Sequence, residues 1–130
     1  MTLEKLSEYY NLLQRLGRAE ELVESLRNAA LPGAQVMTGM PHAPGVKDKL
    51  GDLVVEIADM ERRAEALRRE AEVARQEVAE YIAGIDDDYT RLIFRLRFLH
   101  GLSWGEVAGI VGGRNTADGV KKVCYRFLSL

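Results

Sequence analysis

The chain has 130 residues, of which 47% are apolar and 29% are charged. This length suits one ordinary domain, or a small domain attached to an extended helical element, and is short for two independent cores. A single cysteine excludes a disulfide framework and a multi-cysteine zinc site, and no apolar run approaches the roughly 20 residues that cross a bilayer, so we expect a cytoplasmic protein without membrane contact.

The first predicted element is an amphipathic helix over residues 3–30. Its apolar side chains recur at helical spacing: Tyr9, Leu12, Leu16, Ala19, Val23, Leu26 and Ala30. Residues 31–46 follow as a loop, because they contain all three prolines and three of the twelve glycines. This loop is long for a plain connection, so a binding role for its central part, residues 37–45, stays open.

A heptad pattern predicts one long helix over residues 49–85. One core position of the heptad holds Leu50, Ile57, Ala64, Ala71, Val78 and Ile85, and the other holds Leu53, Met60, Leu67, Ala74 and Tyr81. Together with the first helix, this segment predicts a long antiparallel, coiled-coil-like helical hairpin as a first domain over residues 1–85.

Charges beside the heptad bear on self-association. In a parallel self-pair Arg63 would face Arg68, so like charges disfavour parallel dimerisation. The longer second helix leaves apolar surface near Val78, Tyr81 and Ile82. That surface is available either to the C-terminal part of the chain or to a second subunit, so a homo-oligomer remains an alternative.

Residues 86–130 predict a three-helix module. Three aspartates, Asp86 to Asp88, precede its first helix, where carboxylates cap free backbone donors; we interpret them as caps and not as a metal site. The predicted buried stripe of this helix consists of Leu92, Ile93, Leu96 and Leu99, broadened by Phe94 and Phe98. Gly101 suits a left-handed helix end.

Two further helices follow, joined by a tight turn. Ser103 and Glu106 match a capping box, so a helix begins at this point. Ala108 and Gly112 have the spacing of a close helix contact followed by a turn residue. In the last helix we expect Asn115 and Asp118 as caps and a buried stripe of Val120, Val123, Cys124 and Phe127.

The C-terminal module carries the positive charge of the chain. Residues 89–130 contain seven basic and two acidic residues, a net charge of +5, whereas residues 1–88 have a net charge of −7. A basic module of two short capped helices is typical of a helix-turn-helix, whose second helix enters the major groove of double-stranded DNA. The predicted DNA-binding residues are Arg114, Asn115, Thr116, Ala117, Asp118, Lys121, Lys122, Tyr125 and Arg126.

Each residue type in this set suits one kind of DNA contact. Lys121 or Lys122 can donate to guanine, and Thr116 or Ala117 can touch a thymine methyl group. Basic residues and Tyr125 can hold phosphates. For Asp118 two interpretations stay open, a helix cap and an acceptor for a cytosine amino group.

Residues 95–108, RLRFLHGLSWGEVA, resemble the start of the DNA-binding region 4 of bacterial sigma factors. The pairs at 40–41 and 48–49, the long charged helix, GRNTAD at 113–118 and VCYRFL at 123–128 resemble small phage and prophage proteins of the RinA/ArpU type. This resemblance implies a regulator of late phage transcription. Compared with the sigma pattern, the turn before Val120 is two residues longer.

The function that we expect is therefore that of a phage or prophage DNA-binding transcriptional regulator. One alternative is a small terminase-like packaging subunit, and another is a factor that binds host RNA polymerase through its long helix. We expect no enzyme activity and no cofactor, because neither His42 nor His100 has a nucleophile or carboxylate at a catalytic spacing.

Overall fold

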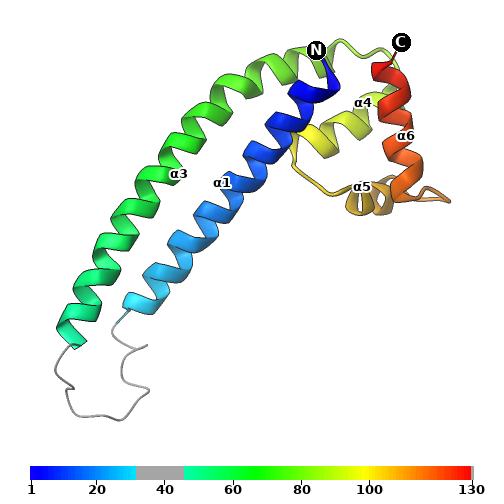
Figure 1. The fold of residues 1–130 in the computed structure, drawn as a ribbon. Helices are drawn as coiled ribbons and strands as arrows, with labels where there is room; N and C mark the ends of the chain where they lie inside the picture. Colours follow the sequence, from blue (N-terminus) through cyan, green and yellow to red (C-terminus); the bar gives the residue numbers. More distant parts are fainter. Residues whose placement is uncertain (32–45, 130) are drawn as a thin grey trace. The chain divides into compact units, whose positions relative to one another are not determined.

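A computed structural model describes residues 1–31 and 46–129 of the chain (Figure 1). These residues form five α-helices and one π-helical turn, and no strand occurs among them, so the predicted all-α class is confirmed. The predicted loop at 31–46 falls almost wholly outside the described residues.

Two helices agree closely with the ranges that the sequence predicts, and three shorter helices follow within residues 86–130. Helix α1 spans Leu3–Ala30, as predicted, and α3 spans Val46–Ala83, three residues earlier at its start than expected. Helix α4 covers Asp88–Phe94 and continues as the π-helical turn η2, Arg95–Leu99. Helices α5, Trp104–Val111, and α6, Ala117–Leu128, complete the described chain.

The described chain divides into two compact units, each of which contains part of α1 and part of α3. The first unit consists of residues 1–14 and 70–130, and the second consists of residues 15–69. The domain boundary that we place after residue 85 from the sequence stays a prediction.

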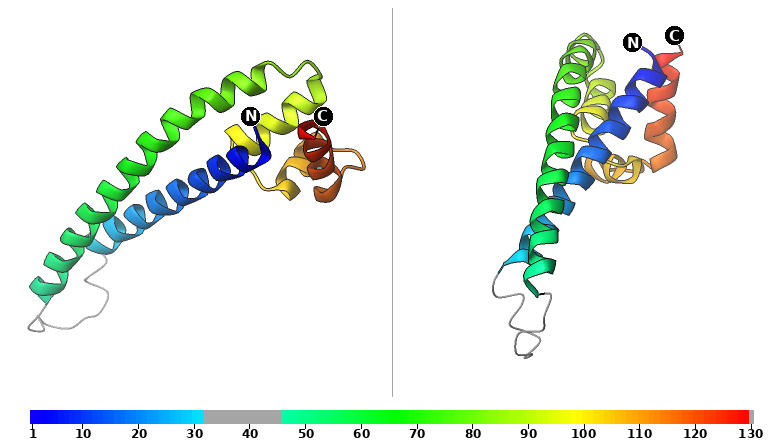
Figure 2. Two further views of the ribbon diagram at one scale, coloured as in Figure 1. Left: turned by 45° about the horizontal axis from the view of Figure 1, so that its top comes forward. Right: turned by 60° about the vertical axis from the view of Figure 1, so that its left-hand side comes forward.

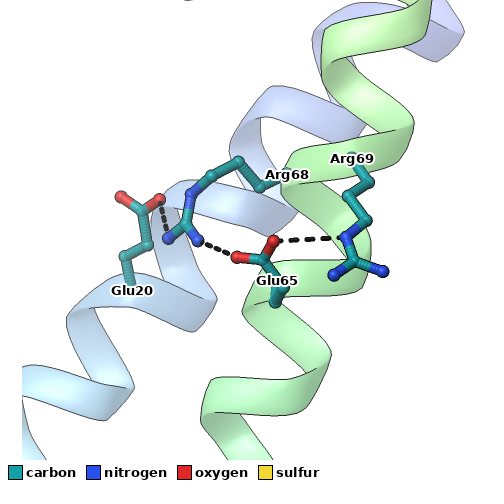
Figure 3. Close-up of polar contacts among 4 residues, drawn as sticks. All are labelled: Glu20, Glu65, Arg68 and Arg69. Atoms are coloured by element: carbon teal, nitrogen blue, oxygen red, sulfur yellow. Dashed lines mark hydrogen bonds and ion pairs between the residues drawn. The ribbon is translucent and has the colours of Figure 1, made fainter.

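In the second unit α1 and α3 run antiparallel, joined by ion pairs across their exposed flank (Figure 3). Arg68 donates to Glu20 at 3.1 Å, and Arg27 pairs with Glu61 about two turns further along. Glu65 also accepts from Arg68 at 2.6 Å and from Arg69 at 3.2 Å. Since these side chains are about half exposed or more, the pairs contribute little stability each.

The core of the first unit is built around Phe94. Its ring centroid lies 5.6 Å from that of Phe98 and 5.4 Å from that of Phe127, and 6.3 Å from that of Tyr81 on α3. Aromatic rings at such distances bury a large apolar area. The apolar surface predicted near Val78 and Tyr81 is thus covered within the chain, since Val78 is buried and Tyr81 meets Phe94.

One prediction for α4 is wrong. Leu92, placed in the buried stripe from the sequence, is 44% exposed, whereas Thr90, Phe94 and Phe98 form the inner face at four-residue spacing. The large rings bury more apolar area than the leucine does, so they take the centre and turn Leu92 outward. Ile93 is fully buried, as predicted.

The first turn of α4 is capped by one of the three aspartates. The Asp87 carboxylate accepts from the backbone N–H of Thr90 at 2.9 Å and from its hydroxyl at 2.8 Å, and these bonds lower the pKa of Asp87. Asp88 instead pairs with Arg91. The prediction that these aspartates include a cap is therefore confirmed for Asp87.

None of the helices in the described ranges combines the length and the apolar character that a bilayer crossing requires.

Candidate nucleic-acid interface

The helix before the candidate interface is fixed by a capping box, as predicted. Ser103 Oγ accepts from the backbone N–H of Glu106 at 3.2 Å, and the Glu106 carboxylate accepts from the backbone N–H of Ser103 at 3.1 Å. Bonds from Ser103 lower the pKa of Glu106. They satisfy two donors that the first turn of α5 would otherwise leave open.

Two glycines with positive φ form the turn between α5 and α6. Gly112 has φ 71° and Gly113 has φ 68°, values that strain any residue with a Cβ. The expectation of a positive-φ turn residue at Gly112 is confirmed. The side chain of Asn115 then bridges the turn, because its Nδ2 donates to the Gly112 carbonyl at 2.7 Å.

The cap of α6 differs from our expectation. Thr116 is the N-cap residue, and its Oγ1 accepts from the backbone N–H of Gly119 at 3.0 Å. Asn115 and Asp118, predicted as the cap pair, do not fill this role. Thr116 has the extended backbone that an N-cap needs, and its hydroxyl reaches the third following residue, which leaves Asn115 in the turn.

One side of α6 is sealed against α4 and α5. Val120 and Cys124 are fully buried, and Val120 clusters with Ile93, Val107 and Ala108. Burial raises the pKa of Cys124 to about 12, which is expected of a thiol that only fills a core. The predicted buried stripe is confirmed at these two positions, and Val123 and Phe127 are half-buried.

The other side of α6 and the preceding turn are exposed. Figure 2 shows α6 and this turn in two further views of the ribbon. Eight of the nine predicted DNA-binding residues are exposed there: Arg114, Asn115, Thr116, Ala117, Asp118, Lys122, Tyr125 and Arg126. The ninth, Lys121, is half-buried. All nine lie within one continuous segment, the turn and the first ten residues of α6.

Lys121 and Tyr125 contact each other on the surface of α6. The Lys121 ammonium lies 5.4 Å from the centroid of the Tyr125 ring, within the range of a cation–π contact. The Tyr125 ring in turn meets Trp104 of α5 edge-on, at 6.4 Å. These contacts orient Lys121 and Tyr125 along one flank of α6.

Two of the seven basic residues in the C-terminal module contact other parts of the protein and lie outside α6 and its preceding turn. Arg91 pairs with Asp88 and donates to the Ile85 carbonyl at 2.8 Å. The Arg97 guanidinium lies between the rings of Tyr10, at 3.5 Å, and Trp104, at 4.4 Å. The charge that remains on this module is therefore concentrated on the turn and on α6, apart from the exposed Arg95.

Arg97 is a residue whose role the sequence did not indicate. Its Nη1 donates to the Leu102 carbonyl at 3.1 Å, its Nε is buried without a partner, and burial lowers its pKa. The sequence identifies it only as one of the seven basic residues of the C-terminal module. The only available signal was its position three residues after Phe94 and one before Phe98, on the face that the two rings bury.

Tyr89 is a second residue that sequence reasoning missed. Its hydroxyl donates to Asn115 Oδ1 at 2.8 Å, although the two residues are 26 positions apart. No sequence pattern predicts such a pair, because the partners lie on different elements.

A groove of about 790 Å³ also lies between α1 and α3 in the second unit. Its walls carry four glutamates and four arginines: Glu20, Glu24, Glu61, Glu65, Arg27, Arg62, Arg68 and Arg69. These charges balance, so the groove has no net attraction for a polyanion. The exposed side of α6 is therefore the better candidate for a nucleic-acid interface.

No protein-family model, curated protein or solved structure matches this chain.

Proposed function

We propose that this protein binds double-stranded DNA through a helix-turn-helix formed by α4, α5 and α6, with α6 as the recognition helix. In such a module the second helix of the motif lies in the major groove and its first residues contact base edges. A capped α5, a turn with two positive-φ glycines and a capped α6 with a buried inner side support this arrangement.

The observation that carries the proposal is the division of α6 into two sides. Cys124 and Val120 are fully buried, whereas Lys122 and Arg126 are exposed and Arg114 is exposed on the adjacent turn. A DNA duplex is bound mainly through its phosphates, so a DNA-binding helix needs exposed cations on one side. Its other side must be packed against the protein, as it is in α6.

We further propose that the protein is a phage or prophage transcriptional regulator that acts on late genes in the bacterial cytoplasm. The resemblance to sigma region 4 and to RinA/ArpU-type proteins supports this role. In this proposal residues 1–85 form an antiparallel helical hairpin for assembly or for contact with RNA polymerase, and their net negative charge keeps them away from DNA.

The test measures binding to labelled 40-bp duplexes from the late promoter region of the phage that carries the gene. We expect the double variant Lys121→Ala/Lys122→Ala to bind the best duplex about tenfold more weakly at 0.1 M salt. The slope of log affinity against log salt should fall by nearly one for each phosphate that the variant no longer neutralises. Fluorescence anisotropy between 50 and 200 mM salt gives both quantities.

The matched control is Arg62→Ala/Arg63→Ala, which removes two exposed cations from α3 in the second unit. This variant should bind like the wild type. If wild-type protein shows no salt-dependent binding, the proposal is wrong and a factor that binds only protein becomes the better hypothesis. A ring of eight or more subunits by light scattering would favour the packaging subunit instead.

A further inference from the structure

A chain of side-chain hydrogen bonds joins the start of α4 to the turn before α6. The Tyr89 hydroxyl donates to Asn115 Oδ1 at 2.8 Å, and Asn115 Nδ2 donates to the Gly112 carbonyl at 2.7 Å. Gly112 is the C-cap residue of α5. One amide side chain thus connects three segments: the beginning of α4, the end of α5 and the residue directly before the cap of α6.

The turn has few other means of holding its conformation. Gly112 and Gly113 both adopt positive φ, and glycine is the residue with the largest conformational freedom to lose. The backbone bond that closes the turn, from Asn115 N–H to the Gly112 carbonyl, is long at 3.5 Å. The shorter bonds made by the Asn115 side chain are therefore the stronger constraint on the direction in which α6 leaves the turn.

The same bonds restrict what Asn115 can do toward DNA. Asparagine reads adenine by donating from Nδ2 and accepting at Oδ1 at the same time. In this structure the oxygen already accepts from Tyr89 and the nitrogen already donates to Gly112. Each atom keeps one further lone pair or N–H, but the two bonds hold the amide in its present direction, so turning it toward a base edge would break them.

We infer that Tyr89 and Asn115 are positioning residues for the proposed DNA-binding surface, and that Asn115 does not read a base. Tyr89 lies outside the segment that carries the predicted contacts, and it acts on DNA affinity through Asn115. By fixing the turn, the pair places Arg114 and the first turn of α6 in one orientation. This inference rests on the proposed function.

The experiment is a double-mutant cycle with Tyr89→Phe, Asn115→Ala and the combined variant in the full chain. Tyr89→Phe keeps the ring and removes only the hydroxyl. The first readout is unfolding in guanidinium, followed by the fluorescence of Trp104, the only tryptophan of the chain. Each single variant should shift the folding equilibrium by a factor of about 2 to 10, and the combined variant should cost no more than Asn115→Ala alone.

The second readout is the dissociation constant for the best late-promoter duplex and for copies of it with single base changes. Both single variants should weaken binding by a similar factor, about 2 to 10, without changing the order of preference among the duplexes. The salt slope should match that of the wild type, because the cations that meet the phosphates are all retained. Asn11→Ala, at an exposed position of α1, is the control and should change neither readout.

Three results would overturn the inference. Additive effects on stability would show that the two residues do not act together, and a changed base preference for Asn115→Ala alone would make it a reader. Absence of duplex binding by the wild type would overturn the proposed function and the positioning role with it. In that last case coupling in the unfolding measurements would still identify the hydrogen-bond chain, so the two failures are distinguishable.

Discussion

Arg97 shows how one half-buried cation joins distant parts of the first unit. Its guanidinium lies between Tyr10, near the amino end of α1, and Trp104, at the start of α5. Cation–π contacts with two rings and a bond to the Leu102 carbonyl offset part of the cost of removing the charge from water. The planar guanidinium suits this stacked position, which a lysine ammonium would not fill equally well.

At the same scale, we predict that the Cys124 thiol is inert in the folded protein. Its pKa is raised to about 12 by burial, so almost no reactive thiolate exists at pH 8. Alkylation by iodoacetamide, followed by mass spectrometry, should be at least about a hundredfold slower than for the chain in guanidinium. Rapid alkylation of the native chain at pH 8 would contradict the burial of this residue.

The raised pKa of Cys124 also has a consequence for stability. The folded thiol keeps its proton to higher pH than the unfolded thiol, whose ordinary pKa is 9.0. The contribution of this group is therefore complete below about pH 9 and is lost as the pH rises from about 9 to about 12. Folding favours the neutral thiol throughout this range.

Residue-level predictions from the sequence succeeded where the signal is local. The capping box at Ser103 depends on two residues three positions apart, and the positive φ of Gly112 depends on the residue itself. The cap of α6 was assigned to Asn115 and not to Thr116 because three neighbouring residues can all cap a helix. Only the partner from another element, Tyr89, decides the role of Asn115.

At the scale of single elements, we predict that Ser103→Ala lowers the free energy of unfolding by about 1 kcal/mol. The substitution removes the acceptor for the Glu106 N–H and breaks the reciprocal pair that starts α5. Chemical denaturation followed by circular dichroism measures the change.

Ser25→Ala is the matched control for this prediction, because Ser25 is exposed within α1. Alanine has the higher helix propensity, so this variant should be neutral or slightly stabilising. Equal losses for the two substitutions would mean that the capping box contributes nothing measurable.

The helices themselves were largely predictable, because the apolar residues of α1 and α3 recur at helical spacing over many turns, which excludes the two-residue period of a strand. The inner face of α4 was not, because Leu92 and Phe94 are both apolar and only packing decides between them. The π-helical turn at Arg95–Leu99 also has no sequence signature. It changes the bonding of this stretch, so that the His100 N–H reaches the Arg95 carbonyl, five residues back.

At the scale of the whole molecule, we predict that shortening one buried side chain near the amino end destabilises the carboxyl-terminal helices. Leu6 is fully buried in the first unit, which also contains α4, α5 and α6. Leu6→Ala should lower the free energy of unfolding by about 2 to 5 kcal/mol. Trp104 fluorescence should report this loss, although the residue is almost a hundred positions away from the substitution.

Leu31→Ala provides the control for Leu6→Ala, because Leu31 is 56% exposed. Its effect should stay within about 0.5 kcal/mol. An unchanged midpoint of the Trp104 signal in Leu6→Ala would show that residues 86–130 fold independently, as the domain boundary predicted from the sequence implies.

The first unit is made of two segments far apart in the sequence, and this determines when it can form during synthesis. Gln14 donates to the Gly101 carbonyl at 2.9 Å across a separation of 87 residues, and the first unit holds no residue between 14 and 70. The amino-terminal turns leave the ribosome long before their partners exist. Tyr10 and Gln14 must therefore remain without their partners Arg97 and Gly101 until those residues have been translated.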